Sequence, residues 1–194
     1  VEGWRLLTDP TFDAPGRKYH IAWGASTRKV TGPRLAVEEV APVDAVLLTH
    51  DHHADNLDDA GRAMLPSAGP VLTTVSGAKR LGGNARGLEA WGATRLELPG
   101  RLPIDVTATP CRHGPRGSHM IVGDVIGFAL RWDGQEHGVL WISGDTVHYD
   151  GVRQSLDGSR LGGSAVSNLH LSTDALAKGL DLSLTVGNLF DKRY

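Results

Sequence analysis

The hydrophobic positions of the chain form continuous runs in some segments and alternate with polar positions in others, and both patterns predict β-strands. Residues 43–50 (VDAVLLTH) and 70–75 (PVLTTV) are short runs rich in Val and Leu, as expected of strands covered on both faces. Residues 94–99 and 104–110 alternate, which predicts half-exposed strands. We therefore expect four strands in these segments, and a further one in residues 1–9.

Helical patterns separate these strands. Residues 56–65 (NLDDAGRAML) place apolar side chains on one face of a short helix, and residues 76–83 end in glycine, a common helix stop. Residues 124–132 and 138–145 predict two paired strands joined by a turn at DGQEH. Residues 10–42 predict loops and short elements. This interleaving indicates a layered α/β or α+β domain.

Composition narrows the class of protein. The 194 residues are enough for one domain with a real core, and 40% hydrophobic residues are typical of a soluble globular protein. The net charge of −2 gives no reason to expect nucleic acid as a partner, and the single cysteine excludes an intrachain disulfide. There is no apolar run of ~20 residues and no signal-peptide pattern, so we expect a cytoplasmic protein.

A cluster of ionisable side chains directly follows the first buried strand. The segment LLTHDHHADNLDDAGR contains three histidines and four aspartates, among them His50, His52, His53 and Asp55. Imidazole together with carboxylate suits zinc, iron or manganese, and a loop at a strand end is a common place for such groups. A solvated polar loop that carries histidines by chance is the alternative. We favour a metal site.

Two later segments and two neighbouring aspartates fit such a site. His113 lies in ATPCRHGP, just after an alternating strand, and Asp145 lies in LWISGDT, directly after another. Alone, a histidine in such a turn is more often simply exposed, and the aspartate alone could equally be a turn or helix-cap residue. Asp51 and Asp58 are expected to orient the imidazoles by hydrogen bonds.

Taken in order, these segments resemble the metallo-β-lactamase-fold hydrolase superfamily, in particular its ascorbate-6-phosphate lactonase-like branch. THDHHADNLD stands where that superfamily has its His-x-His-x-Asp-His metal loop. RHGP stands where it has a third-strand histidine, and SGDT where it has the aspartate that bridges two metals. The resemblance covers residues 1–153 and implies an αββα sandwich whose second half is truncated in this chain.

The loop fits the ligand spacing of that superfamily in more than one register. Counting from His50 gives His50 and His52 as the first two ligands, whereas a shift by one residue gives His53 and Asp55. A one-residue bulge lets His50, His53 and Asp55 act together. The spacing alone does not choose between these registers.

The resemblance implies a metal-dependent hydrolase that uses a metal-activated water on an ester, lactone, amide or phosphoester-type small molecule. One or two Zn²⁺ ions, with Mn²⁺ or Fe²⁺ as alternatives, would be held by His50, His52, His53, Asp55, His113 and Asp145. Asp55 would be the catalytic residue that orients or deprotonates the water. The loops show no charge cluster typical of a phosphate or nucleic-acid substrate, apart from Arg112 and Arg116 beside His113.

The composition changes after residue 153. Residues 179–190 alternate strictly, and GLDLSLTVGNLFDKRY resembles the closing segment of TonB-dependent outer-membrane receptors. Two strands cannot form a membrane barrel, since their unpaired edges would be too costly in lipid. We therefore expect an incomplete α+β metallo-β-lactamase αββα sandwich in residues 1–153 and an unrelated, β-hairpin-like tail in residues 154–194.

Two other functions stay open. The first Val, in place of Met, favours a fragmentary or rearranged reading frame, and the chain would then be a non-catalytic truncated or chimeric remnant that binds at most one metal. Its exposed sheet would require an oligomer or a partner to cover it. An outer-membrane receptor fragment is the second alternative, which depends on the tail alone, since residues 1–153 indicate no membrane contact.

Overall fold

The chain divides into two compact units, Val1–Leu161 and Gly162–Tyr194. The computed structural model describes residues 1–20, 26–114, 123–136, 138–147, 149–152, 154, 169–177 and 180–186. The expected division into residues 1–153 and 154–194 stays a prediction.

The first sheet of the larger unit is parallel and carries the buried strands. Its order is β1-β4-β5-β6, and the strands span Leu6–Thr8, Ala45–Leu47, Val71–Thr74 and Ala85–Leu88 respectively. Every residue of β4 and β5 is buried. Because successive side chains of a strand point to opposite faces, a continuous apolar run of this kind can contact one layer on each face of the sheet.

The helices of the larger unit are short and follow the strands closely. They are α1 (Val37–Val40), α2 (Asp59–Met64), which continues as a 3₁₀ turn at Leu65–Ser67, and α3 (Val75–Leu81). The helices predicted in residues 56–65 and 76–83 are confirmed as α2 and α3. No helix in the described part of the chain is both long enough and apolar enough to cross a membrane.

The second sheet is antiparallel. Its order is β10-β9-β8-β7, with strands at Leu140–Ile142, Ile126–Arg131, Ile104–Pro110 and Ala93–Leu96 respectively. Val106 of β8 is paired with Leu130 of β9, and Ala108 with Phe128, so one face of these strands is continuously apolar. The predicted pairing of the last two strands is confirmed, because β9 and β10 are antiparallel neighbours.

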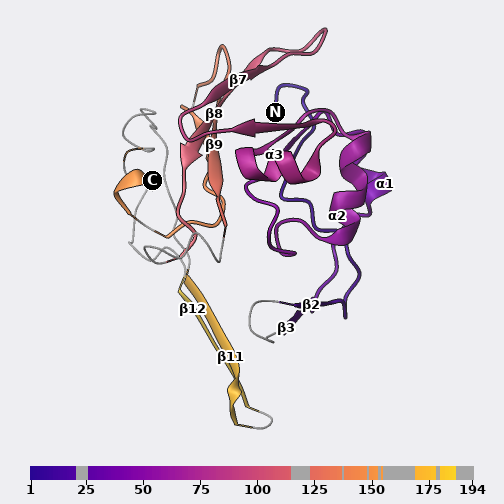
Figure 1. Ribbon diagram of the computed structural model, residues 1–194, viewed down its shortest axis with the longest axis vertical. Coiled ribbons are helices and arrows are strands. Elements are labelled where there is room, and N and C mark those ends of the chain that lie inside the picture. The colour runs from indigo at the N-terminus through magenta and orange to yellow at the C-terminus, as the bar shows by residue number, and fades with distance from the viewer. Residues whose placement is uncertain are drawn as a thin grey trace. The chain divides into compact units, whose positions relative to one another are not determined.

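Two hydrophobic clusters hold the layers together. One fills the space between the sheets, and its members include Ala45, Leu47, Leu72, Ile104, Val106, Phe128 and Leu130. The other packs the opposite face of the first sheet against the helices, with Val46, Leu48, Val71, Leu57, Met64 and Leu65. Alternate residues of β4 thus enter different clusters. In Figure 1, α1 and α2 lie to one side and β8 and β9 to the other, so a helix layer and two sheet layers of the expected partial sandwich are present.

Two further strand pairs lie outside these sheets. In the larger unit, β2 (Lys18–His20) and β3 (Ser26–Arg28) form a short antiparallel hairpin within a region where the sequence predicts loops and short elements. In the smaller unit, β11 (Leu169–Ala177) and β12 (Leu180–Val186) pair antiparallel.

Candidate metal centre

The candidate site lies where four strands of the two sheets end. Asp9 follows β1 and His50 follows β4, and these are parallel neighbours whose carboxyl ends lie at the same sheet edge. His113 and Asp145 follow β8 and β10 of the second sheet. The backbone N–H of Ile126 donates to the carbonyl of Thr49, which joins the two sheets beside the site.

Three histidines converge at this edge. His50, His53 and His113 each offer one ring nitrogen, and the three atoms lie within 4.8 Å of one another. The Nε2 atom of His113 is 3.1 Å from Nδ1 of His53, and the ring of His50 lies 5.3 Å and 5.4 Å from those of His53 and His113 between centroids. Three imidazole nitrogens at this spacing are a donor set that suits a single transition-metal ion.

Hydrogen bonds that involve Thr49 and Asp9 determine the orientation and the tautomer of His50. The Thr49 backbone N–H and hydroxyl donate to the two carboxylate oxygens of Asp9 at 2.7 Å and 2.9 Å. Because the hydroxyl has only one proton, its oxygen accepts from Nδ1 of His50 at 3.0 Å. The lone pair of His50 is therefore on Nε2, the atom that lies 4.0 Å from Oδ2 of Asp145.

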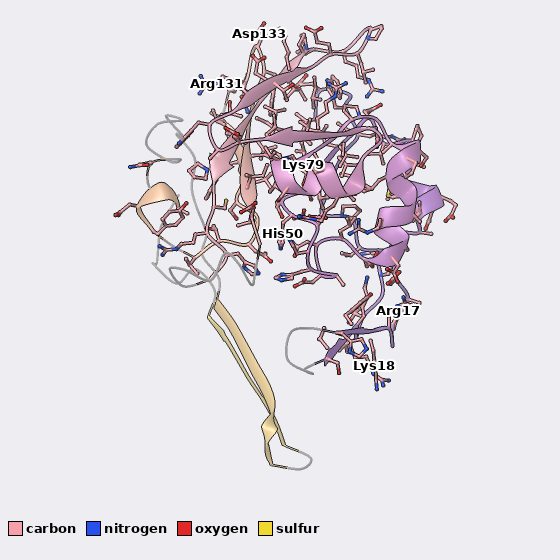
Figure 2. The ribbon with its side chains drawn as sticks, in the orientation of Figure 1. Arg17, Lys18, His50, Lys79, Arg131 and Asp133 are labelled. Carbon is pink, nitrogen blue, oxygen red and sulfur yellow. The ribbon has the colours of Figure 1, made fainter. Side chains whose placement is uncertain are left out.

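Burial keeps this histidine neutral. The side chain of His50, which is labelled in Figure 2, is fully buried. Desolvation and, after it, the neighbouring imidazoles of His53 and His113 together lower the pKa of His50 to about 4, against the effect of Asp55. At neutral pH the ring is thus an uncharged ligand with an available lone pair.

Asn56 connects the carboxylates of the site. One orientation of its side-chain amide places the nitrogen 3.4 Å from Oδ2 of Asp9. The opposite orientation donates to Oδ1 of Asp55 at 3.3 Å and to Oδ2 of Asp145 at 3.2 Å, and it satisfies the surroundings better. Asp55 and Asp145 are thereby held next to each other beside the histidines. The pKa of Asp9 is raised by burial, and the hydrogen bonds from the backbone N–H and the hydroxyl of Thr49 oppose that effect.

His52 is not in the group that converges. Its Nδ1 atom lies 3.7 Å from Oδ1 of Asp51, and its ring packs so closely against Gly123 that a Cβ there would come within 2.3 Å of Cε1. Of the histidines that the registers allow, the structure brings His50 and His53 together with His113 and leaves His52 outside that group. Metal binding by His50, His52, His53, Asp55, His113 or Asp145, and the catalytic role of Asp55, stay predictions.

Asp58 has a different function from the one expected of it. Among the described contacts it orients no histidine. Its carboxylate instead accepts from the backbone N–H of Gly61 at 2.7 Å, which starts α2, from the N–H of Asp13 at 2.6 Å and from Lys29 at 2.9 Å. It therefore ties the end of the histidine loop to the segment before β2.

Three residues that orient the site were not recognised as such in the sequence. Asp9 ends the first strand in LLTDP, Thr49 ends the buried run, and Asn56 stands in the loop itself. The polar residues at the strand ends could have indicated their role, because the carboxyl ends of neighbouring parallel strands lie at the same edge of a sheet. Arg112 faces the aromatic ring of Tyr149 at 4.5 Å from its centroid, and Arg116 lies outside the described residues.

Comparison with known proteins agrees with this architecture. A family described as the β-lactamase superfamily domain matches residues 4–166. The UPF0173 protein YddR of Bacillus subtilis (strain 168) is 28% identical over 120 residues, which cover 59% of this chain and 43% of YddR. An isothiocyanate hydrolase from Delia radicum gut bacteria superposes with a TM-score of 0.62 at 22% identity, over 80% of this chain and 62% of that one.

A second solved structure gives the same result. A possible metal-dependent hydrolase from Veillonella parvula DSM 2008 has a TM-score of 0.60 at 22% identity, again over 80% of this chain and 62% of the other. At this identity the likeness concerns the fold. The chain spans less than half the length of its curated relative and less than two thirds of either solved structure.

Proposed function

The chain belongs to the β-lactamase superfamily domain family, and on that premise we propose that it is a metal-dependent hydrolase acting on a small molecule. The observation that carries the proposal is the convergence of His50, His53 and His113 beside Asp145. His50 and His53 come from the loop after β4, whereas His113 and Asp145 follow β8 and β10 of the other sheet.

The residues present fit a divalent metal ion. The donor set consists of imidazole nitrogens and carboxylates, which suits Zn²⁺, and Mn²⁺ or Fe²⁺ as alternatives. His50 presents its unprotonated Nε2 because Thr49 accepts from Nδ1, and this arrangement is typical of histidine ligands. His53 and His113 supply the other imidazoles. When bound, such an ion would supply a water that loses its proton near neutral pH, together with polarisation of the scissile bond.

The other groups of the site have distinct tasks in this proposal. Asp55 is solvent-exposed and borders a cavity, so it can accept the proton of a water that attacks the substrate. Asp145 accepts from the same side-chain nitrogen of Asn56 as Asp55 does. The amide of Asn56, by donating to both carboxylates, keeps Asp55 and Asp145 in place without adding charge. Asp9 and Thr49 do the same for His50.

The substrate class follows from the chemistry of an activated water. Esters, lactones, amides and phosphoesters all react with it, and the pocket then selects among them. The resemblance to the lactonase-like branch favours a lactone or ester. The names of the two solved relatives, an isothiocyanate hydrolase and a possible metal-dependent hydrolase, also support hydrolysis.

The proposal is tested by hydrolysis assays on the full chain after chelation and reloading with Zn²⁺, Mn²⁺ or Fe²⁺. Substrates are p-nitrophenyl acetate, a γ-thiolactone, an anilide and bis-p-nitrophenyl phosphate. We expect turnover of at least one substrate with at least one metal, and a loss of about 10²- to 10⁴-fold in kcat for Asp55→Asn. The matched control is Asp133→Asn, at the end of the second sheet remote from His50 in Figure 2.

Two results would contradict the proposal. Absence of turnover with every metal would leave the alternative of a non-catalytic protein that binds at most one ion. Equal kcat for Asp55→Asn and Asp133→Asn, in a wild type that is active, would remove Asp55 from the mechanism and assign the activity to another group.

A further inference from the structure

A cavity of about 730 Å³ adjoins the candidate metal centre. One wall is the histidine loop, from His52 to Asp55, and another is the β2–β3 hairpin with the residues that flank it. Since His53 and Asp55 belong both to this wall and to the site, a molecule in the cavity lies next to the proposed reactive groups. Its volume is in the range of small-molecule sites.

Positive charge dominates the described lining of this cavity. Four cationic side chains line it, namely Arg17, Lys18, Arg28 and Lys29, whereas Asp55 is the one carboxylate in the described lining. Figure 2 shows Arg17 and Lys18 at the hairpin. Arg17 is paired with Asp59, and Lys29 with the buried carboxylate of Asp58 at 2.9 Å. These two charges are therefore compensated by groups of the protein itself.

Lys18 and Arg28 differ from the other two cations. They are directly opposite each other in the antiparallel pair of β2 and β3, so both side chains are on one face of the hairpin. Both residues are exposed, and neither forms an ion pair with any carboxylate of the described residues. Like charges directly opposite on a strand pair are destabilising, and an anion between them would remove that repulsion.

We infer that the cavity selects substrates that carry an anionic group, a carboxylate or a phosphate, which binds between Lys18 and Arg28 while the scissile bond lies toward His53 and Asp55. This inference rests on the proposed hydrolase function and names its substrate class. Charge-assisted hydrogen bonds from Lys and Arg to anionic oxygens are among the stronger polar contacts. The exposed position of the pair makes the contact sensitive to salt.

The test compares p-nitrophenyl esters that differ only in the charge remote from the scissile bond. The butyrate ester is neutral. The ester of glutaric acid keeps one free carboxylate, and the ester of 4-phosphonobutyric acid keeps a phosphonate group. For the wild type we expect kcat/KM to favour an anionic ester over the butyrate. In Lys18→Gln/Arg28→Gln that preference should fall about tenfold, mainly through KM. The anionic ester with the larger kcat/KM relative to the butyrate shows whether the site prefers a carboxylate or a phosphate.

The matched control is Lys79→Gln, which removes an exposed cation of α3 outside the cavity and should leave the preference for anionic esters intact. Raising the salt concentration should reduce the preference in the wild type and in Lys79→Gln, but not in the double variant. An equal preference in the double variant and in Lys79→Gln, or no preference in the wild type, would overturn the inference.

A binding measurement tests the anion site independently of hydrolysis. Glutarate and inorganic phosphate are titrated into the wild type and the double variant by calorimetry. If no ester is turned over but one anion binds the wild type about tenfold more tightly than the double variant, the anion site stands and the hydrolase function fails. Turnover of esters without any such difference in binding or in preference leaves the hydrolase and refutes the anion site.

Discussion

The guanidinium of Arg80 donates two hydrogen bonds to the carboxylate of Asp51, the residue that directly follows His50. Nε lies 2.9 Å from Oδ2 and Nη2 lies 2.5 Å from Oδ1. The carboxylate is 2% exposed, and Arg62 donates to the backbone carbonyl of Asp51 at 3.2 Å. Burial raises the pKa of Asp51, but Arg80 outweighs it, so the pKa is lower than usual. The start of the histidine loop is thus fixed from α2 and α3.

Removal of this guanidinium should destabilise the protein. Arg80→Ala leaves the carboxylate of Asp51 buried without its partner, which costs about 2 kcal/mol in the free energy of unfolding. Urea denaturation followed by circular dichroism measures the loss. Lys79→Ala, a change at the neighbouring exposed position of α3, should shift the free energy by less than about 0.5 kcal/mol. If both variants unfold at the same urea concentration, the ion pair does not stabilise the loop.

The stability of the protein should also depend on the ionisation of Asp58. Burial raises the pKa of its carboxyl, yet hydrogen bonds from Asp13, Lys29 and Gly61 together lower it below the usual value. Because the pKa is lower in the folded state, the carboxylate contributes stability above the unfolded pKa of about 3.9, and this contribution is lost as the pH falls through the folded value.

Asp58→Asn tests this linkage. At pH 7 we expect the variant to be less stable than the wild type by about 2 kcal/mol, since Lys29 and two backbone N–H groups lose a charged acceptor. The difference should shrink below about pH 4. Urea midpoints at pH 7, 5 and 3 measure it, with the exposed Asp133→Asn as control. A difference that stays constant down to pH 3 means that Asp58 acts through shape and not through charge.

The sequence predicted the layers well where the hydrophobic pattern was regular. The continuous apolar run of β4 and the alternation of β8 both correspond to strands. A strand buried on both faces is apolar throughout, whereas a strand buried on one face alternates between apolar and polar residues. Strand β6 was missed, since Ala85–Leu88 (ARGL) has neither pattern and is a strand through its backbone pairing with β5. Helix α2 begins at Asp59, inside the predicted range, because Asp58 caps it.

The three histidines that converge are all among the residues that the sequence singled out, but their geometry could not be predicted from it. Spacing alone could not choose between His52 and His53, because the choice depends on the path of the backbone after His50. The residue after His50, Asp51, is paired with Arg80 on a later helix, and this contact cannot be inferred from the sequence. The cationic cavity was missed for a similar reason: its charges come together only when β2 and β3 pair.

Gly144 should be essential for the position of Asp145. Its φ is +59°, and a Cβ there would lie 2.8 Å from the side chain of Thr49 and 3.0 Å from the carbonyl of Ile126. Gly144→Ala therefore adds a steric clash to backbone strain, and we expect a loss of about 2–3 kcal/mol in the free energy of unfolding. The clash would also move Asp145 away from His50.

A second glycine separates the two effects. Gly134 also has a positive φ, of +78°, but a Cβ there meets nothing within 4 Å, so Gly134→Ala carries the strain alone. We expect it to cost about 1 kcal/mol. Thermal and urea unfolding of both variants measure the difference, and equal losses would show that the contact with Thr49 does not constrain the turn before Asp145.

The central claim is that His50, His53 and His113 form one metal centre from which His52 is excluded. Zinc content per chain and zinc affinity, measured on the wild type, His52→Ala, His53→Ala and His113→Ala after chelation and reloading, test it most directly. We expect the wild type and His52→Ala to hold zinc equally. His53→Ala and His113→Ala should lose more than about 100-fold in affinity, beyond the usual effect of residues that only orient a ligand. Loss of zinc from His52→Ala to the same extent as from His53→Ala, or a wild type without zinc, would contradict the account.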